Sequence, residues 1–216
     1  MKVLVGCESS GTVREAFRKL GHDAWSNDLL DADDNSPFHI KGDVFDAIKS
    51  DNWDLGIFHP PCTYLTVSAS RWLYHPEDKD LPSKDRRPHP LYPNRRQDQL
   101  DAVEFVKRLM KVPFAYAIEN PVGHLSTAIC KPTQIIQPNQ FGHPTTKKTC
   151  LWLKGVSPLK PTKIVEPEYG ITKSGRKWDK WWLETSSLPL SIRWKVRSKT
   201  FQGIADAMAD QWGGVA

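Results

Sequence analysis

Cysteine is scarce in this chain, with only four residues, at positions 7, 62, 130 and 150, among 216. No two of them form a C-x-x-C pair, so the sequence contains no zinc signature of the common type. A chain of this length buries a substantial core without covalent staples, which makes a disulfide framework unnecessary. We therefore expect reduced thiols in a cytosolic setting.

Long apolar runs are also missing. No stretch approaches the roughly 18 apolar residues that a membrane span requires. The first residues, MKVLVG, lead straight into a strand-like pattern without the apolar stretch of a secretory signal, and no internal repeat is visible. We expect a soluble, cytoplasmic protein made of one domain, or of one domain with a small appended segment.

The charge balance is moderately basic. The chain has 30 Lys and Arg against 25 Asp and Glu, a formal net charge of +5. This excess favours a phosphate-bearing partner, but an ordinary solvated surface carries the same excess, so charge leaves both interpretations open. The basic residues gather at Arg86 and Arg87, Arg95 and Arg96, Lys147 and Lys148, and within residues 173–180.

Apolar periodicity in the first two thirds of the chain alternates between strand and helix. Strands are expected at 2–5, 23–26, 53–58 and 114–118, and helices at 12–20, 44–50 and 93–110. This alternation predicts an α/β fold with a mostly parallel sheet that carries helices on both faces. Ligands of such sheets bind beyond the carboxyl ends of the strands. The loop at 6–11, Asp28, Cys62 and Glu119 all fall at such ends.

The later part of the chain has a different character. Residues 132–139 and 150–154 are expected to be extended, and 200–212 has helical spacing. Residues 155–198 are rich in Pro, Lys and Trp, and we expect them to form a small segment on the substrate side. The polar stretch 63–94 is long for a structureless connection, which suggests a lid over a site.

The first loop, with its small residues between a strand and a helix, presents backbone N–H groups and a helix N-terminus to a polar ligand. It lacks a clean G-x-G-x-x-G, so an ordinary strand-to-helix turn is the alternative. Asp28 stands about twenty residues on, where an acidic side chain accepts hydrogen bonds from a ribose in nucleoside-binding folds. Asp43 is a candidate for an adenine amino group, or simply the cap of the next helix.

Cys62 and Glu119 are the strongest candidates for chemistry. Cys62 directly follows a strand and two prolines, which hold its backbone extended, and a partly exposed thiol there is placed to act as a nucleophile. A buried structural cysteine is the alternative. Glu119 ends another strand, where burial would raise the pKa of the carboxyl group and allow it to share a proton near neutral pH. A salt-bridged loop carboxylate is the alternative.

In their order along the chain, these motifs resemble those of the cytosine-C5 methyltransferase family, best known as DNA methyltransferases. His59-Pro60-Pro61-Cys62-Thr63 is similar to that family's Gly-Phe-Pro-Cys-Gln motif, and Glu119-Asn120-Pro121 to its Glu-Asn-Val motif. Residues 141–149, FGHPTTKKT, are similar to its Tyr-Gly-x-Pro-Gln-x-Arg-x-Arg segment. The resemblance covers about 1–154 and the C-terminal helix.

The resemblance implies a Rossmann-like methyltransferase domain formed by 1–154 with 199–216, and S-adenosylmethionine as the cofactor. It implies that Cys62 attacks carbon 6 of a cytosine while Glu119 holds the ring nitrogen. The cofactor would lie against Gly6, Glu8, Ser9, Ser10, Gly11, Asp28, Asp43, Val44 and His59. The substrate would contact Pro61, Asn120, Lys147, Arg71, Arg95 and Arg96.

Departures from the family pattern concern the substrate side. Thr63 replaces the glutamine after the nucleophile, and Lys147 and Thr149 replace two arginines, which removes bidentate planar contacts. DNA-acting members insert a recognition domain where this chain has only the short segment 155–198. We therefore expect a cytosine nucleotide such as CMP or dCMP as the substrate, with cytosine in DNA as the alternative. A non-catalytic nucleic-acid-binding relative is a further alternative.

The aromatic and basic residues of the substrate side have two interpretations each. The tryptophans at 178, 181 and 182 either stack on bases or form the core of the small segment, and the second interpretation is favoured because aromatic side chains mostly serve burial. Arginines at 71, 86, 87, 95 and 96 are candidates to grip a phosphate, or belong to a solvated loop.

Overall fold

A seven-stranded sheet forms the centre of the protein in a computed structural model, which describes residues 1–214. The strand order is β3-β2-β1-β4-β5-β7-β6. Strand β7 runs antiparallel to both of its neighbours, and the other strands are parallel to one another. The prediction of an α/β fold with a Rossmann-like, mostly parallel sheet is confirmed. The strands are β1 (Lys2–Gly6), β2 (Asp23–Asp28), β3 (His39–Lys41), β4 (Leu55–Phe58), β5 (Ala115–Pro121), β6 (Gln134–Ile136) and β7 (Thr149–Lys154).

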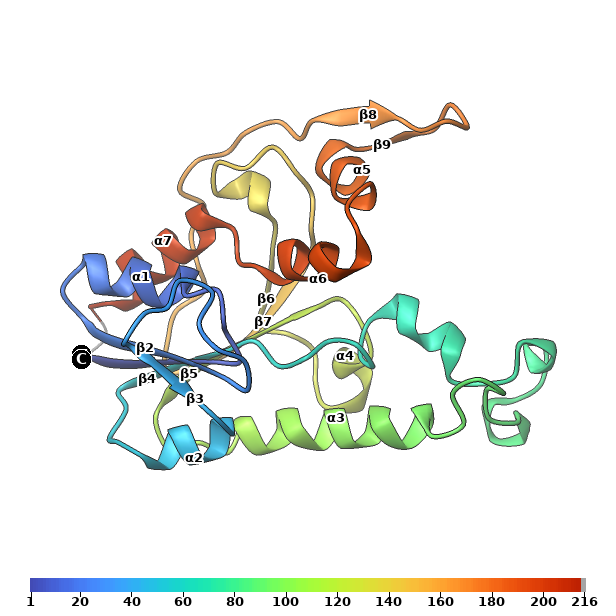
Figure 1. Ribbon diagram of the computed structural model, residues 1–216, viewed down its shortest axis with the longest axis horizontal. Coiled ribbons are helices and arrows are strands. Elements are labelled where there is room, and N and C mark those ends of the chain that lie inside the picture. Colours follow the sequence, from blue (N-terminus) through green and yellow to red (C-terminus); the bar gives the residue numbers. More distant parts are fainter. Residues whose placement is uncertain (215–216) are drawn as a thin grey trace.

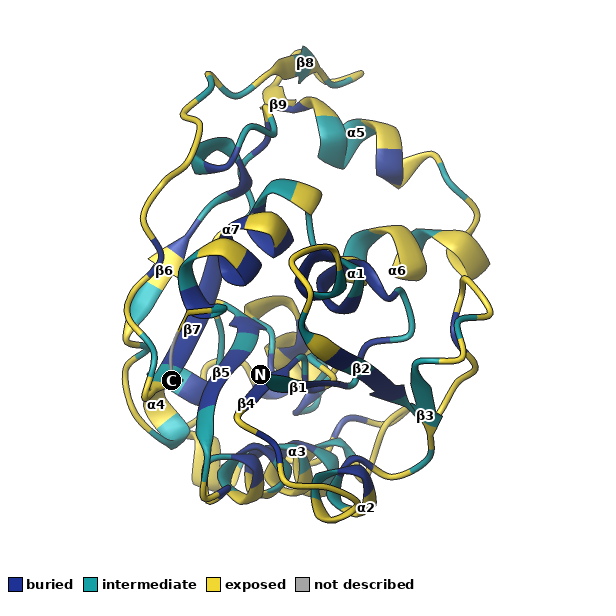
Figure 2. Ribbon diagram, turned by 90° about the vertical axis from the view of Figure 1, so that its left-hand side faces the viewer, coloured by how far each residue is buried: buried dark blue, intermediate teal, exposed yellow. Residues whose placement is uncertain are grey.

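Helices cover both faces of the sheet (Figures 1 and 2). On one face, α1 (Thr12–Lys19) and α7 (Gln202–Trp212) pack against each other and against the sheet. On the other face lie α2 (Val44–Lys49), α3 (Arg95–Leu109) and the short α4 (Leu125–Ala128). Each face of the sheet has its own hydrophobic core. Side chains alternate along β1, so Val3 and Val5 pack on the α1 and α7 face, whereas Leu4 packs on the α2 and α3 face.

The expected elements of the main domain are present, with shifts of at most three residues at their ends. The second strand continues to Asp28 and the fifth to Pro121, because pairing with neighbouring strands carries them past their apolar runs. The long helix begins at Arg95 rather than at 93. The connection 63–94 contains three short 3-10 helices, Val67–Trp72, Pro76–Asp78 and Ser83–Asp85.

The segment 155–198 divides into two parts. Its first residues pack on the main domain: Leu159 is buried, and its backbone exchanges two hydrogen bonds with the side chain of Gln134, at 2.7 and 2.8 Å. The rest projects from the sheet domain (Figure 1). It forms elements for which the sequence pattern gave no indication, namely β8 (Tyr169–Ile171), β9 (Lys177–Asp179), α5 (Lys180–Ser186) and α6 (Leu190–Ser198).

Asp179 ties the projecting part to the main domain. Its carboxylate is buried and accepts hydrogen bonds from the Thr145 hydroxyl at 2.7 Å and from the Thr146 backbone N–H at 2.7 Å. It also accepts from the backbone N–H of Trp182, which caps the start of α5. One carboxylate therefore places the projecting part relative to the chain that leads into β7.

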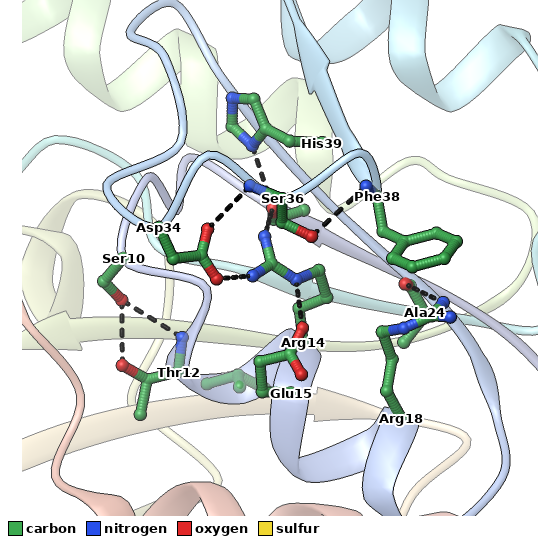
Figure 3. Close-up of polar contacts among 12 residues, drawn as sticks. Ser10, Thr12, Arg14, Glu15, Arg18, Ala24, Asp34, Ser36, Phe38 and His39 are labelled. Atoms are coloured by element: carbon green, nitrogen blue, oxygen red, sulfur yellow. Dashed lines mark hydrogen bonds and ion pairs between the residues drawn. The ribbon is translucent and has the colours of Figure 1, made fainter.

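Arg14 organises the chain beside the end of β2 (Figure 3). Its side chain is fully buried, donates to Ser26 Oγ at 2.8 Å, and forms ion pairs with Glu15 and Asp34. Ser26 Oγ in turn contacts Nδ1 of His39 at 2.8 Å. This network holds the 29–38 connection against α1. Within residues 1–214, no helix has the length and apolar character needed to cross a membrane.

Candidate active site

A cleft of about 370 Å³ opens at the carboxyl ends of β1, β2 and β4. Four of the predicted site residues line it, Asp28, Asp43 and Val44 from the expected cofactor set and Pro61 from the expected substrate set. Sequence reasoning missed the remaining lining residues, which come from the first loop, from the end of β2, from the turns after β3 and β4, and from α3: Cys7, Asn27, Leu29, Gly42, Tyr64, Asp98, Asp101, Ala102 and Phe105. The α3 residues carried no signal, because only the tertiary fold brings this helix over the sheet edge.

The lining of the cleft is acidic and apolar. Four carboxylates reach it, from Asp28, Asp43, Asp98 and Asp101, and none of its described lining residues is Lys or Arg. Such a rim repels a ligand with a pyrophosphate and attracts a cation that also carries hydroxyl donors. Apolar surface from Val44, Leu29 and Phe105 suits a flat base. These acceptors and apolar side chains therefore fit S-adenosylmethionine, which combines a sulfonium and an ammonium with a ribose and an adenine.

Two of these carboxylates are held by backbone donors. Asp28 Oδ1 accepts from the Leu30 N–H at 3.0 Å, and Asp43 Oδ1 accepts from the Phe45 N–H at 2.7 Å. Asp43 therefore is the N-cap of α2, as the alternative interpretation predicted, and it lines the cleft as well. Cys7 lies between them: burial, together with the charges of Asp28 and Asp43, raises the pKa of its thiol to about 12. Cys7 is consequently an inert wall of the cleft.

The first loop has structural partners of its own. Glu8 is buried, and its carboxylate accepts from the Val13 N–H at 2.9 Å and from the Ser10 hydroxyl at 3.1 Å. A carboxylate of this chain thus occupies the positive end of α1 where the sequence predicted a ligand. Gly11 adopts a left-handed conformation with φ 66°. A side chain at Gly6 would collide with Phe58 and Val44. Five residues of the expected cofactor set do not line the cleft: Gly6, Glu8, Ser9, Ser10 and Gly11.

The turn that carries Cys62 is joined directly to the end of β5. The side-chain amide of Asn120, which is buried, donates to the Pro60 carbonyl at 2.8 Å. After the turn, the Leu65 carbonyl accepts from the His124 backbone N–H at 2.7 Å. Cys62 itself is partly exposed, as predicted. The Nδ2 group of Asn120 thus holds the turn that carries Cys62, and the expected contact of Asn120 with substrate stays a prediction.

His59 and Glu119 lie side by side at the ends of the paired strands β4 and β5. Nδ1 of His59 is 3.3 Å from Oε2 of Glu119. Burial lowers the pKa of His59, but the hydrogen bond and negative charge of Glu119 outweigh it, so the pKa is raised. Burial raises the pKa of Glu119, but the hydrogen bond and charge of His59 and the charge of Lys147 outweigh it, so the pKa is lowered. The lowered pKa of Glu119 is opposite in direction to the raised carboxyl pKa expected from the sequence.

The same charges act on the Cys62 thiol. Burial raises its pKa most strongly, the charge of Glu119 raises it further, and the charge of Lys147 lowers it. The charges of Glu119 and Lys147 both act on the Cys62 thiol, so we describe the three residues as one electrostatic cluster. The Lys147 ammonium is anchored by the Arg197 carbonyl at 2.8 Å.

A second, narrow pocket lies on the α7 side of this cluster. Its lining includes Glu119, Lys147 and Phe201, and its free volume is about 10 Å³, the space of one water molecule. A pyrimidine base enters this pocket only if the side chains around it move. Because the pocket is bordered by residues 198–201, the chain between α6 and α7 controls its width.

The arginines predicted to grip a phosphate have varied surroundings. Arg86 donates to two backbone carbonyls and Arg87 pairs with Asp78 and Glu77, so both serve the 63–94 connection itself. Arg95 donates to the Thr63 carbonyl at 3.0 Å and lies over the Tyr64 ring at the edge of the cleft. Arg96 donates to Gln99, and the exposed Arg71 lies over Trp72.

The tryptophans of the segment 155–198 differ from one another. Trp181 and Trp182 pack edge to face at 5.1 Å, and Trp181 also contacts Phe201 at 5.3 Å. The prediction that the tryptophans form the core of the segment is supported by the partial burial of these two. It is wrong for Trp178, which is 53% exposed on β9, because β8 and β9 form a two-stranded sheet with no further layer over that face.

No protein-family profile matches this sequence, and no curated protein sequence matches it. The fold is similar to that of a solved protein from Escherichia coli, provisionally described as a DNA modification methyltransferase encoded within a prophage. The match has a TM-score of 0.42 and 14% identity and covers 77% of this chain and 52% of the other. The chain thus spans about half of that protein, and a likeness of this degree assigns no function. Within residues 1–214, no group of three or more His, Cys, Asp or Glu side chains is placed to hold a metal.

Proposed function

We propose that this protein is an S-adenosylmethionine-dependent cytosine-C5 methyltransferase. One observation carries the proposal: the Cys62 thiol, in the turn after β4, is electrostatically coupled to the Glu119 carboxylate of the adjacent strand β5, and the turn borders a carboxylate-lined cleft. The family resemblance of the motifs around Cys62 and Glu119 supports the same assignment.

Different residues of the cleft would contact different parts of the cofactor. Asp28 would accept hydrogen bonds from the ribose hydroxyls, and Val44 and Phe105 would cover the adenine faces. The rim carboxylates would balance the positive charge. When bound there, S-adenosylmethionine supplies an electrophilic methyl group for carbon 5 of the base.

The chain's own residues prepare the base for that transfer. The thiolate of Cys62 adds to carbon 6, which turns carbon 5 into a nucleophile. Glu119 contacts the ring at nitrogen 3 and the amino group, where electron density accumulates during the addition. Lys147 lowers the pKa of the Cys62 thiol and so increases the thiolate fraction.

We propose cytosine in DNA as the substrate, which reverses the preference drawn from sequence. Residues 155–198 hold nine basic and four acidic residues, so this segment carries the whole net charge of +5. Exposed apolar side chains accompany that charge, Ile171 and Trp178 on the hairpin and Trp194 on α6. Basic surface interleaved with exposed aromatic rings suits a phosphate backbone with accessible bases.

A free cytosine nucleotide is the second candidate. The observation that favours it is the narrow pocket at Glu119 and Lys147, which is bordered by the chain at 198–201 rather than open to a duplex. In that case Lys147 or Arg95 would meet the phosphate.

A transfer assay with methyl-labelled cofactor tests these proposals together. CMP, dCMP, dCTP, single-stranded DNA and duplex DNA are offered in parallel. We expect label in DNA, as 5-methylcytosine after hydrolysis. Label only in the nucleotides would support the second candidate. No label in any substrate, with no cofactor binding by calorimetry at about millimolar concentration, would favour a non-catalytic relative and overturn the proposal.

A further inference from the structure

His59 has no role in the proposed chemistry so far, although it touches the catalytic carboxylate. The family motif has glycine at this position, so the contact is a feature of this chain. The His59 side chain is 10% exposed, and its Nδ1 faces Oε2 of Glu119 at 3.3 Å. Its other ring nitrogen, Nε2, is buried and has no hydrogen-bond partner among the described residues.

The charges around His59 favour a proton on its ring. Glu119 reaches it from β5, Glu8 from the loop after β1, and Lys147 from the chain before β7. Two of these groups are anionic and one is cationic, and the nearest is the carboxylate in hydrogen-bond contact. Burial opposes the charge on the imidazole, but the two carboxylates outweigh it, so the pKa of His59 is raised.

An ionised Glu119 creates a difficulty for the cytosine reaction. When sulfur adds to carbon 6, nitrogen 3 of the ring must gain a proton, because otherwise the adduct holds a full negative charge. A carboxyl group whose pKa is lowered by its partners carries no proton near neutral pH. A group in hydrogen-bond contact with Glu119 can supply the proton for nitrogen 3, and His59 is in such contact.

We propose that His59 is a positioning residue that stores this proton and passes it through Glu119 to nitrogen 3 as the Cys62 sulfur bonds to carbon 6. The proposal rests on the cytosine-C5 function. His59 acts through Glu119 and needs no contact with the base.

The steps balance as follows in protons and electron pairs. The thiol of Cys62 first loses its proton to water. Its sulfur then bonds to carbon 6, the C5=C6 pair moves to C4=C5, and the N3=C4 pair moves to nitrogen 3. Nitrogen 3 takes a proton from Glu119, which receives one from Nδ1 of His59. After carbon 5 has gained its methyl group, loss of the carbon 5 proton to water expels the sulfur, and nitrogen 3 returns its proton through Glu119 to His59.

Release of tritium from [5-³H]cytosine in DNA, without cofactor, tests the addition step. The substitution His59→Gln removes the stored proton, and Glu119 must then take its proton from solvent. Because a group loses its protonated fraction about tenfold per pH unit above its pKa, the ratio of wild-type to variant rate should rise about tenfold or more between about pH 5.5 and about pH 7.5. His22→Gln, before β2 at the opposite end of the sheet, is the matched control and should leave the rate unchanged.

A second measurement reads the resting proton directly. In ¹⁵N spectra of the seven histidines, the His59 ring should be protonated near neutral pH, and Glu119→Gln should lower its pKa. This measurement requires no catalytic turnover, and it does not depend on a His59 variant that could fail to fold.

The outcomes separate the two proposals. A wild-type to His59→Gln rate ratio that is constant with pH would overturn the proposal that His59 stores the proton, and so would a neutral His59 ring near pH 7. In either case, tritium release by the wild-type protein would still support the cytosine chemistry. If the wild-type protein released no tritium and transferred no methyl group although His59 titrated as expected, the cytosine function itself would fail, and the proton store with it.

Discussion

The acidic rim of the cleft leads to a prediction about cofactor affinity. In the substitution Asp28→Asn, the side-chain oxygen still accepts the hydrogen bond that Asp28 Oδ1 now receives from the Leu30 N–H at 3.0 Å. The local turn is therefore kept, and only the charge of the side chain and one acceptor oxygen change. Any loss of affinity then reports on the ligand rather than on the fold.

The size of the effect follows from the kind of hydrogen bond that is lost. A hydrogen bond to a charged group contributes about 1.5–3 kcal/mol, against about 0.5–1.5 kcal/mol for a neutral pair. The change from carboxylate to amide should therefore cost about 1.4 kcal/mol, which is about tenfold in Kd. Asp28→Ala, which removes the side-chain acceptors altogether, should cost more.

Calorimetric titration with S-adenosylmethionine measures these Kd values. Asp31→Asn is the matched control, because the Asp31 side chain is 80% exposed, pairs with Lys41 at 2.9 Å and does not line the cleft. We expect its Kd to stay within about twofold of wild type, as surface ion pairs contribute little. Unchanged binding by a stably folded Asp28→Asn, or equal weakening by both variants, would refute the assignment of this cleft.

Three further predictions concern the nucleophile, the buried arginine and the hairpin. The substitution Lys147→Met removes the cation that lowers the pKa of Cys62. The pH profile of Cys62 alkylation should therefore move to higher pH, as measured by mass spectrometry of the Cys62 peptide. An unmoved profile would exclude the electrostatic cluster. Arg14→Met should lower the free energy of unfolding in urea by roughly 3 kcal/mol, because Asp34 and Ser26 lose a buried partner, and a loss well below 1 kcal/mol would show that the network is dispensable. Trp178→Ala should weaken binding of a single-stranded oligonucleotide about tenfold in fluorescence anisotropy, since stacking on one base contributes about 1–3 kcal/mol, without changing cofactor affinity. Equal oligonucleotide binding by the variant would remove the hairpin from the proposed interface.

Much of the sheet domain was predictable because its elements are short, periodic and closed by local signals. The apolar runs at β1, β4 and β5 are continuous, as expected for strands buried on both faces, and each stops at a polar or proline-rich turn. From these strand ends, the sequence predicted that Asp28, Cys62 and Glu119 lie at one edge of the sheet. Residues 169–198 were not predicted, because their strands have three residues each and α6 has no buried residue to create a periodic pattern.

The protonation of the site could not be predicted. A carboxylate at a strand end is expected to have a raised pKa from burial alone, and that expectation failed for Glu119. The His59 ring, sixty positions away in the chain, reaches it only because β4 and β5 pair in parallel register. The pairing of β4 with β5 also brings the Asn120 side-chain amide to the Pro60 carbonyl, a hydrogen bond that the sequence did not predict.

The amino-acid sequence by itself thus determined the α/β class, the order of the strands along the chain and the identity of the thiol and carboxylate, since periodicity and strand-end residues are local properties. Tertiary structure decided which charges meet. It brought α3 over the cleft and placed His59 and Lys147 around Glu119. It also made the later part of the segment 155–198 project from the sheet domain (Figure 1). Electrostatic interactions act through space and fall off with distance, so residues far apart in the chain set the protonation of the site once folding brings them together.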